Sequence, residues 1–401
     1  MNFEHDPADE VFQADVRSYI RTTLADLFPD RVRSGIGAPY TKADMQRWTR
    51  ALNAKSLLVP HWPQEWGGTA WPANWRRILD EELAAVDCPS TDAIGTDFVG
   101  PVLCAFGNQE QKTRYLRAIR EGKQFWCQGF SEPGAGSDTM SLSATAVQER
   151  DHFIVNGHKV WTSNAHFSDM MFALLRIETP GVRRQQGLSF LLIDMYSAGV
   201  TVRPLILIDG VHRVNEVLLE NVRVPTGNLI GERGKGWVYA RYLLANERTV
   251  VAGLGRTRTL IRELRRIATE ELGNRPSVLN DPVFAARLSQ VEVELQALDF
   301  MDLRWLHSRT DDGGAQMLPP ILKLRGTELR QRVAELIMKL LGDQALELPS
   351  QNQGQDQTPI SGQPPFVANA VRNFLFQRSA TIAGGTSEIQ RNLIAGLALQ
   401  S

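Results

Sequence analysis

The feature that most constrains the fold is a change in the spacing of apolar residues, from helical to β-type and back to helical. Near the N-terminus, apolar side chains recur every three or four positions, at Phe12, Val16, Ile20, Leu24 and Leu27. Asp6-Pro7 places a capping carboxylate before a proline at the first helical position, and Pro29 ends the run. We therefore expect residues 1–124 to form an N-terminal α-helical domain.

Between about residues 125 and 235 the pattern becomes typical of strands. β-branched and aromatic runs flank Asn156-Gly157, a pair that favours a tight hairpin turn. Further β-rich runs lie at Leu188–Ile193 and Val200–Val202, bounded by glycine and proline. The sequence therefore predicts a middle β-domain over residues 125–235.

From Gly236 onward the helical spacing returns. One long helix is expected through Val250, Leu254, Ile261, Leu264 and Ile267, a second through Leu288, Val291, Val293, Leu295 and Leu298, and a third from Ile321 to Leu341. The polar stretch from Gln351 to Pro365 is expected to be an exposed loop. Residues 236–401 should thus form a C-terminal four-helix-type bundle.

Charge and composition exclude several classes of protein. Lys plus Arg (44) almost balances Asp plus Glu (45), so no overall field favours nucleic acid or an anionic membrane. The three cysteines make neither a disulfide framework nor a metal pattern, and we expect no metal site. The N-terminus has no signal-peptide pattern, and no apolar run has the length of a membrane span. We expect a soluble protein of the cytoplasm.

Two segments have the residue types that bind a planar cofactor. Ser131 to Asp138 combines small residues with hydroxyls, so its backbone can approach a ring closely and bond its polar edge. Trp161 and Ser163 offer an indole wall and a hydroxyl two residues later on a strand. The alternatives are an ordinary Gly/Ser turn for the first segment and a core tryptophan for the second.

Five segments in this order resemble the acyl-CoA dehydrogenase family: Trp126–Asp138, Lys159–Asn164, Val222–Pro225, Gly231–Trp237 and Ala383–Arg391. The resemblance implies the acyl-CoA dehydrogenase-like fold, with helical, β and helical-bundle domains in that order. It also implies FAD-dependent desaturation of an acyl-CoA between Cα and Cβ. A base takes the α-proton, a β-hydride passes to flavin N5, and the electrons leave through an electron-transfer flavoprotein.

The resemblance also implies site residues. The expected FAD contacts are Gln128, Phe130 (through its backbone), Ser131, Gly136, Ser137, Trp161, Ser163, Thr386 and Glu388. Ser137 is also expected near the bound thioester, and Arg248 near the CoA moiety.

The catalytic base is displaced from its common position. Many family members carry glutamate directly before the closing Gly-Thr-Ser, where this chain has Gly384. Glu247 matches a subset of the family whose base precedes the arginine of an earlier helix, and apolar neighbours around it favour burial, which would raise its pKa. Gly384 can still donate its backbone N–H to the thioester carbonyl. Ser387, with Gln390 three residues later, fits a capping box at the start of the last helix.

Two segments depart from homotetrameric members of the family. The regions in which such members carry residues that complete a neighbour's FAD site read Arg275–Pro282 and Leu341–Ala345 here, and neither matches. That combination resembles the pimeloyl-CoA dehydrogenase large subunit and the catalytic subunit of steroid side-chain acyl-CoA dehydrogenases. It implies a homologous partner subunit, with self-association as the alternative, and a dicarboxylyl- or bulky acyl-CoA substrate.

Two other functions stay open on the sequence. A flavin-dependent monooxygenase on the same fold would need no carboxylate at Glu247 and would often use a histidine in its pocket. A non-catalytic, flavin-holding subunit of a hetero-oligomer would explain Gly384 without any base.

Overall fold

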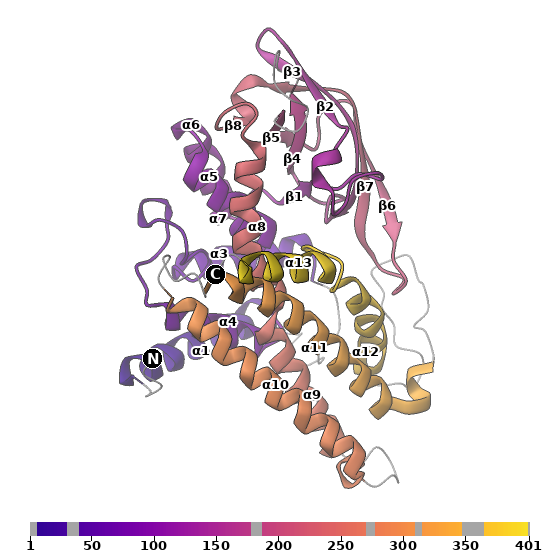
Figure 1. Cartoon of the computed structure of the whole chain (residues 1–401). Coiled ribbons are helices and arrows are strands. Elements are labelled where there is room, and N and C mark those ends of the chain that lie inside the picture. Colours follow the sequence, from indigo (N-terminus) through magenta and orange to yellow (C-terminus); the bar gives the residue numbers. More distant parts are fainter. Residues whose placement is uncertain are drawn as a thin grey trace. The chain divides into compact units, whose positions relative to one another are not determined.

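The computed structural model describes residues 6–29, 40–177, 187–269, 277–308, 315–346 and 365–399. The chain divides into two compact units (Figure 1). One unit combines Tyr40–Ala70 with Pro89–Glu247, and the other combines Met1–Pro39, Trp71–Cys88 and Arg248–Ser401. The first is called the sheet unit below, and the second the bundle unit.

The sheet unit begins with helices. They are α3 (Lys42–Ala54), α5 (Gly100–Phe106), α6 (Gln109–Gln111) and α7 (Arg117–Arg120), with π-helical segments at Ile94–Val99 and Lys112–Leu116. The start of α3 is fixed by a capping box in which Thr41 and Asp44 exchange side-chain and backbone bonds. Buried Trp48 and Leu52 then anchor its apolar face.

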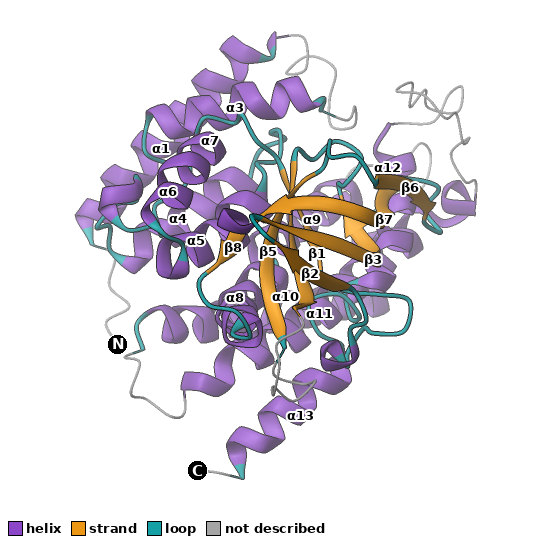
Figure 2. Ribbon diagram, turned by 90° about the horizontal axis from the view of Figure 1, so that it is seen from above, coloured by secondary structure: helices purple, strands orange, loops and turns teal. Residues whose placement is uncertain are grey.

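An eight-stranded sheet follows these helices in the same unit (Figure 2). Its strands are β1 (Trp126–Gly129), β2 (Thr145–Glu149), β3 (His152–Ser163), β4 (Met170–Ile177), β5 (Leu188–Asp194), β6 (Val200–Ile206), β7 (His212–Pro225) and β8 (Leu229–Ile230). Their order is β6-β7-β3-β2-β4-β5-β8, and β1 pairs with β4. The pairings are antiparallel except for β1 with β4 and β2 with β4. β4 is buried along its whole length, which explains its unbroken apolar run.

The hairpin predicted at Asn156-Gly157 is wrong. β3 runs straight through this pair, and the β3–β7 register shifts there instead, as at a β-bulge. Asn156 exchanges bonds with Asn221, and a Cβ at position 157 would lie 2.3 Å from the Ala144 Cβ. Glycine is therefore required for close packing rather than for a turn. The turn itself joins β2 to β3 at Arg150, whose φ is +54°.

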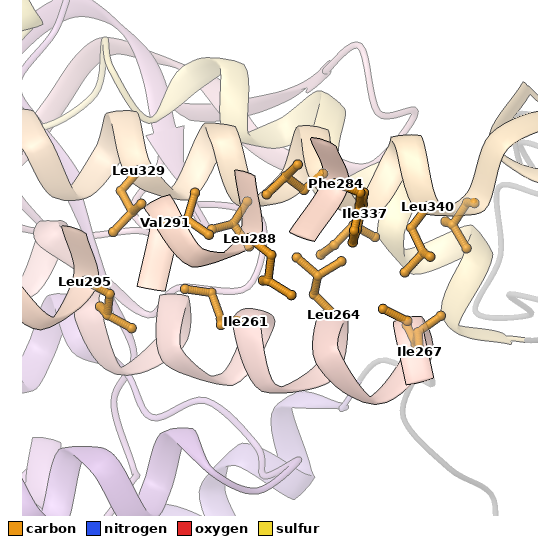
Figure 3. Packing of buried hydrophobic residues seen from close by; sticks show 14 of the residues in the cluster. Ile261, Leu264, Ile267, Phe284, Leu288, Val291, Leu295, Leu329, Ile337 and Leu340 are labelled. Atoms are coloured by element: carbon orange, nitrogen blue, oxygen red, sulfur yellow. The ribbon is translucent and has the colours of Figure 1, made fainter. Parts of the chain in front are cut away.

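The bundle unit contains α1 (Pro7–Leu27), α4 (Ala73–Ala84), α9 (Leu254–Thr269), α10 (Pro282–Leu306), α11 (Leu318–Leu341), α12 (Pro365–Phe376) and α13 (Ser387–Ala398). In α1 the predicted cap is confirmed, because the Asp6 carboxylate accepts the Ala8 N–H. Leucine and isoleucine side chains of α9, α10 and α11 interdigitate in one core (Figure 3). The predicted fold class, with N-terminal helices, a middle β-domain and a C-terminal helical bundle, is confirmed.

The predicted long helix through Val250 and Ile267 is two helices. α8 (Gly236–Ala252) ends before Gly253, whose φ of +61° suits glycine, and α9 begins at Leu254. Val293 is a second exception, because its side chain is 67% exposed on α10 although it fits the apolar pattern. The predicted loop from Gln351 lies outside the described residues except for Pro365, with which α12 begins.

In the ranges that the structure describes, every helix is too short or too polar to cross a bilayer.

Candidate functional site

The predicted flavin loop, Ser131–Asp138, leaves β1 and is tied to β3 by backbone bonds. The Val160 N–H donates to the Ser131 carbonyl at 2.9 Å, and Glu132 and Ala135 exchange two backbone bonds of 3.0 Å. The loop is therefore held beside the strand that carries Trp161 and Ser163. The structure thus brings together the two segments singled out from the sequence.

A buried ion pair fixes this arrangement. The Lys159 ammonium donates to the Glu132 carboxylate at 2.8 Å, and the two residues are 0% and 5% exposed. Lys159 also donates to the carbonyls of Phe130 (3.2 Å) and Leu174 (2.8 Å). The carboxylate accepts further bonds from the Ser143 N–H (2.7 Å), the Ser143 hydroxyl (2.6 Å) and the Ala144 N–H (3.0 Å). The pair joins β1, the loop, β3 and β4.

Burial acts on both groups of the pair. Desolvation lowers the pKa of Lys159 to about 8, opposed by the charge of Glu132. Burial also opposes ionisation of Glu132, but the charge and bonds of Lys159 and the bonds from Ser143 hold the pKa of Glu132 below its ordinary value. Both groups are therefore charged at neutral pH. Sequence reasoning missed this pair, although both residues lie inside the quoted motifs.

The outer side of the loop is open. Gly134, Gly136 and Ser137 are exposed, and a Cβ on either glycine would meet no atom within 4 Å. Neither glycine is needed for a positive φ, since neither is among the positive-φ residues. The free space above them fits a ligand that lies close to the backbone. The small, exposed residues of this loop therefore fit the FAD that the sequence predicts here.

Trp161 is not a core residue. Its side chain is 61% exposed, its φ is +60°, and the β3–β7 register breaks around it. A bulky residue in this conformation costs of order 1–3 kcal/mol and is typical of ligand sites. Ser163, two residues on, is also exposed, whereas Thr162 between them is buried. The core alternative is therefore wrong, and the exposed indole and hydroxyl are available to a planar ligand.

Two other loop residues have defined surroundings. The Phe130 ring packs edge-on against Phe172 and Phe190, with centroids 5.6 and 5.4 Å away. The ring is thereby packed among aromatic side chains, and the backbone contact expected for Phe130 stays a prediction. Gln128 lies on β1, opposite Phe172 in the register, and is half-buried.

A histidine cluster that the sequence did not reveal follows Ser163. The buried Asn215 amide donates to the Thr162 carbonyl at 3.0 Å, so its oxygen must face His212, at 2.6 Å. The same amide nitrogen lies 3.3 Å from Nδ1 of His166, which must then accept. The proton of His166 therefore sits on Nε2. Burial and the neighbouring His212 lower the pKa of His166, which favours the neutral imidazole. His166 is an exposed residue, so its Nε2–H is a donor that a ligand can reach.

The predicted base lies on a helix, as expected. Glu247 and Arg248 fall in the second half of α8, and their side chains lie outside the described part. Glu247 is the last residue of the sheet unit, and Arg248 is the first of the bundle unit.

The remaining site residues lie in the bundle unit, where Gly384 and Gly385 precede α13. Their φ angles are +65° and +88°. The predicted capping box is wrong by one residue, because Thr386 is the cap and accepts the Ile389 N–H at 3.3 Å. Gln390 instead turns back to the carbonyls of Gly384 and Gly385, at 3.3 and 3.2 Å. Its side-chain amide is thereby used on the glycine carbonyls and not on the backbone N–H of a cap residue.

Glu388 and the two divergent segments complete the predicted set. Glu388 is exposed, and bonds from its own backbone N–H and the Thr386 hydroxyl hold its pKa below the ordinary value. Arg275 lies outside the described residues. The segment at Leu341–Ala345 forms the end of α11 and a 3₁₀ turn, with Gly342 at a φ of +56°.

We predict that Lys159→Met lowers the free energy of unfolding by roughly 3–5 kcal/mol, because it leaves the buried Glu132 carboxylate without its counter-ion. Urea denaturation of the cofactor-free protein measures this. The matched control is Lys123→Met, which removes the lysine of a solvent-exposed pair with Glu121 and should change the free energy of unfolding far less. Equal effects of the two substitutions would contradict a structural role for the pair.

The pH dependence of the same comparison has a defined sign. The pKa of Lys159 is about 8 in the folded chain and about 10.4 when unfolded, so the unfolded state binds more protons between these values. The stability of the wild type relative to Lys159→Met should therefore rise with pH from about 8 to about 10.4 and be smallest below 8. A flat or falling difference would show that Lys159 is not desolvated in solution.

Three family models match the chain in succession. They are the N-terminal domain (residues 6–123), the middle domain (residues 127–222) and the C-terminal domain (residues 234–399) of acyl-CoA dehydrogenases. Among curated relatives, "Acyl-CoA dehydrogenase IpdE1" of Mycobacterium tuberculosis is 34% identical over 391 residues, covering 96% of each chain. "Acyl-CoA dehydrogenase FadE29" of the same organism is 28% identical and covers 98% of this chain and 97% of its own.

Solved structures share the fold. The ChsE4-ChsE5 complex of M. tuberculosis matches with a TM-score of 0.82 at 24% identity, covering 100% of this chain and 99% of the other. The Tcur3481-Tcur3483 steroid ACAD matches with the same score, identity and coverage. The three domain models and the similarity to IpdE1 show that the chain belongs to the acyl-CoA dehydrogenase family, as an FAD-dependent oxidoreductase that dehydrogenates an acyl-CoA thioester.

Proposed function

We propose that Glu247 is the general base of this dehydrogenase and that it removes the α-proton of the acyl-CoA. The observation that carries the proposal is Gly384, which has no side chain at the position before Gly-Thr-Ser. A dehydrogenase still needs a proton acceptor, so another carboxylate must act. Bound FAD supplies the acceptor of the β-hydride.

The helix that carries Glu247 supports this role. Gly236, Ala240 and Leu243 of α8 are buried and recur at helical spacing. Position 247 follows Leu243 by one helical turn and continues this stripe. This helical position is compatible with a general base, which takes a weakly acidic proton best when its pKa lies near the working pH.

Other residues would hold the ligands. The half-buried hydroxyl of Ser131, the exposed hydroxyl of Ser163 and the indole of Trp161 would bind the flavin edge, with Gln128, the Phe130 backbone and Gly136 beside them. Thr386 and Glu388 would bind FAD from the bundle unit, where Gly384 would donate its N–H to the thioester carbonyl. That bond stabilises the enolate-like charge and so makes the α-proton more acidic. Ser137 would contact the thioester, and Arg248 the CoA moiety.

The proposed substrate is a bulky or dicarboxylyl acyl-CoA. A solved structure with the same fold is described as a steroid ACAD, and this supports the bulky class. The electron acceptor would be an electron-transfer flavoprotein, and the compartment the cytoplasm. The proposed domain boundaries are 1–124, 125–235 and 236–401, supported by the first strand at Trp126 and the return to helix at Gly236.

We also propose that the chain works with a homologous subunit, self-association being the alternative. The segments at Arg275–Pro282 and Leu341–Ala345 lack the residues with which homotetrameric members complete a neighbour's FAD site. The ChsE4-ChsE5 and Tcur3481-Tcur3483 structures are named as pairs of chains, which supports this arrangement.

We predict that Glu247→Gln keeps the fold and the bound FAD but slows anaerobic bleaching of the flavin by acyl-CoA about 10²–10⁴-fold, since a positioned general base contributes that much. Stopped-flow absorbance over a panel of acyl-CoA thioesters measures it. Glu263→Gln, which removes a carboxylate from an ion pair with Arg266 on α9, is the control and should bleach normally. Bleaching at the wild-type rate by Glu247→Gln would refute the assignment. A wild-type protein that no acyl-CoA bleaches would favour the monooxygenase or the non-catalytic subunit.

The partner proposal predicts low FAD occupancy when this chain is expressed alone. Co-expression with a homologous acyl-CoA dehydrogenase subunit from the same genome should raise occupancy to one FAD per pair, and FAD should then raise the melting temperature of both chains together. Flavin absorbance per chain and the mass in solution measure this. Full occupancy in an active homotetramer of this chain alone would contradict it.

A further inference from the structure

A buried lysine controls the backbone of the loop before α13. Lys323, on α11, is 0% exposed, and its ammonium donates to the Gly385 carbonyl at 2.6 Å. Gln390, on α13 and 1% exposed, donates to the same carbonyl at 3.2 Å and to that of Gly384 at 3.3 Å. Both glycine carbonyls are therefore turned toward the interior of the bundle unit.

The geometry of a trans peptide then fixes the neighbouring N–H groups. Within one peptide unit the C=O and N–H point in opposite directions, and the described chain has no cis peptide. The N–H of Gly385 must therefore point away from Gln390, and the N–H of Thr386 away from Lys323. Among the described residues, neither N–H donates to a protein acceptor. These two donors are thus directed outward.

The backbone conformation of Gly384 and Gly385 needs support from neighbouring side chains. Gly384 and Gly385 both have a positive φ, and a Cβ at position 385 would lie 2.6 Å from Nε2 of Gln390. Two successive glycines lose much conformational freedom when they are fixed. Without the lysine and the glutamine, the peptide planes could rotate and the N–H groups would lose their direction.

The local charge favours an oxygen ligand. An ammonium on the Gly385 carbonyl polarises the peptide and strengthens the Thr386 N–H as a donor. The positive end of α13 adds to this field. The pKa of Glu388, which bonds from its own N–H and from the Thr386 hydroxyl hold below its ordinary value, is lowered further by the charge of Lys323. The positive charge of Lys323 therefore favours negative charge at the start of α13.

We propose that Lys323 is a positioning residue for the dehydrogenase reaction: with Gln390 it holds the two glycine carbonyls and so aims the N–H groups of Gly385 and Thr386 at a negatively polarised oxygen of a bound ligand. That oxygen belongs to the thioester carbonyl of the acyl-CoA or to a phosphate of FAD. The inference rests on the proposed function for the loop, to which it adds two donors beside the Gly384 N–H.

The test uses Lys323→Met in the FAD-loaded protein, co-expressed with its partner subunit if loading requires it. Methionine keeps the length of the side chain and removes its charge and donors. Lys339→Met, an exposed lysine on the same helix, is the control. FAD affinity is measured by fluorescence titration, and thioester affinity by the spectral shift that an enoyl-CoA causes in FAD-saturated protein. The melting temperature of the cofactor-free protein is recorded in parallel.

We expect Lys323→Met to bind one of the two ligands about tenfold or more weakly, as the loss of well-aimed, charge-assisted donors implies. Weaker FAD binding assigns the donors to the phosphate, and weaker enoyl-CoA binding with FAD retained assigns them to the thioester. A lower melting temperature with both affinities unchanged would reduce Lys323 to a structural residue and overturn the proposal.

A second variant covers the case in which Lys323→Met does not fold. Gln390→Leu leaves the buried charge but frees the Gly384 carbonyl, and it should weaken the same ligand. Unchanged affinities in this variant would also overturn the proposal. The general-base assignment is tested by flavin bleaching in Glu247→Gln, and this inference by ligand affinity in Lys323→Met and Gln390→Leu, so the two can fail independently.

Discussion

The buried contact between Lys159 and Glu132 is the interaction on which the predicted flavin loop, Ser131–Asp138, depends. The ammonium is bound by one carboxylate oxygen and two backbone carbonyls, and the carboxylate by three more donors. Such a pair contributes little net stability, because desolvation offsets the Coulomb attraction. Its effect is geometric, since these bonds tie the start of the loop to β3, β4 and the segment at Ser143. The loop is thereby held against the strand that exposes Trp161 and Ser163.

The bundle unit also has a buried lysine that holds a loop through a backbone carbonyl. Lys323 is also fully buried and also donates to a backbone carbonyl in a glycine-containing loop. Glycines let a backbone approach a ligand closely but do not hold it in place. In each unit, a desolvated lysine supplies the missing restraint from inside, and the outer side of the loop is left for a ligand. Both lysines therefore serve positioning better than stability.

The fold and the location of the loops could be predicted from the sequence because both depend on local patterns. Apolar spacing found the helices and strands, and the order of five short segments found the family. The errors came from tertiary contacts. Asn156-Gly157 has the chemistry of a turn, but Gly157 is required by close packing against Ala144. The cap of α13 moved to Thr386 because Gln390 serves the glycine carbonyls instead.

The anchors of the site could not be predicted at all. Lys159, Glu132 and Lys323 carry charge, and a sequence pattern places charged residues at the surface unless their partners are known. Those partners lie 27 residues apart for the first pair and 62 residues apart for Lys323 and Gly385. The histidine cluster was missed for the same reason, because His166 and His212 come from separate segments and meet only in the fold, with ring centroids 4.1 Å apart beside Asn215 of β7. Long-range contacts of single polar residues produce no periodic pattern in the sequence from which they could be predicted.

The central claim is that the proton acceptor has moved from the position of Gly384 to α8. The most direct test is exchange of the acyl-CoA α-proton in D₂O, followed by mass spectrometry with the FAD-loaded protein kept anaerobic. This exchange reports proton removal apart from hydride transfer. The account predicts deuterium at Cα with the wild type and none above background with Glu247→Gln. Undiminished exchange by Glu247→Gln would contradict it and place the base elsewhere.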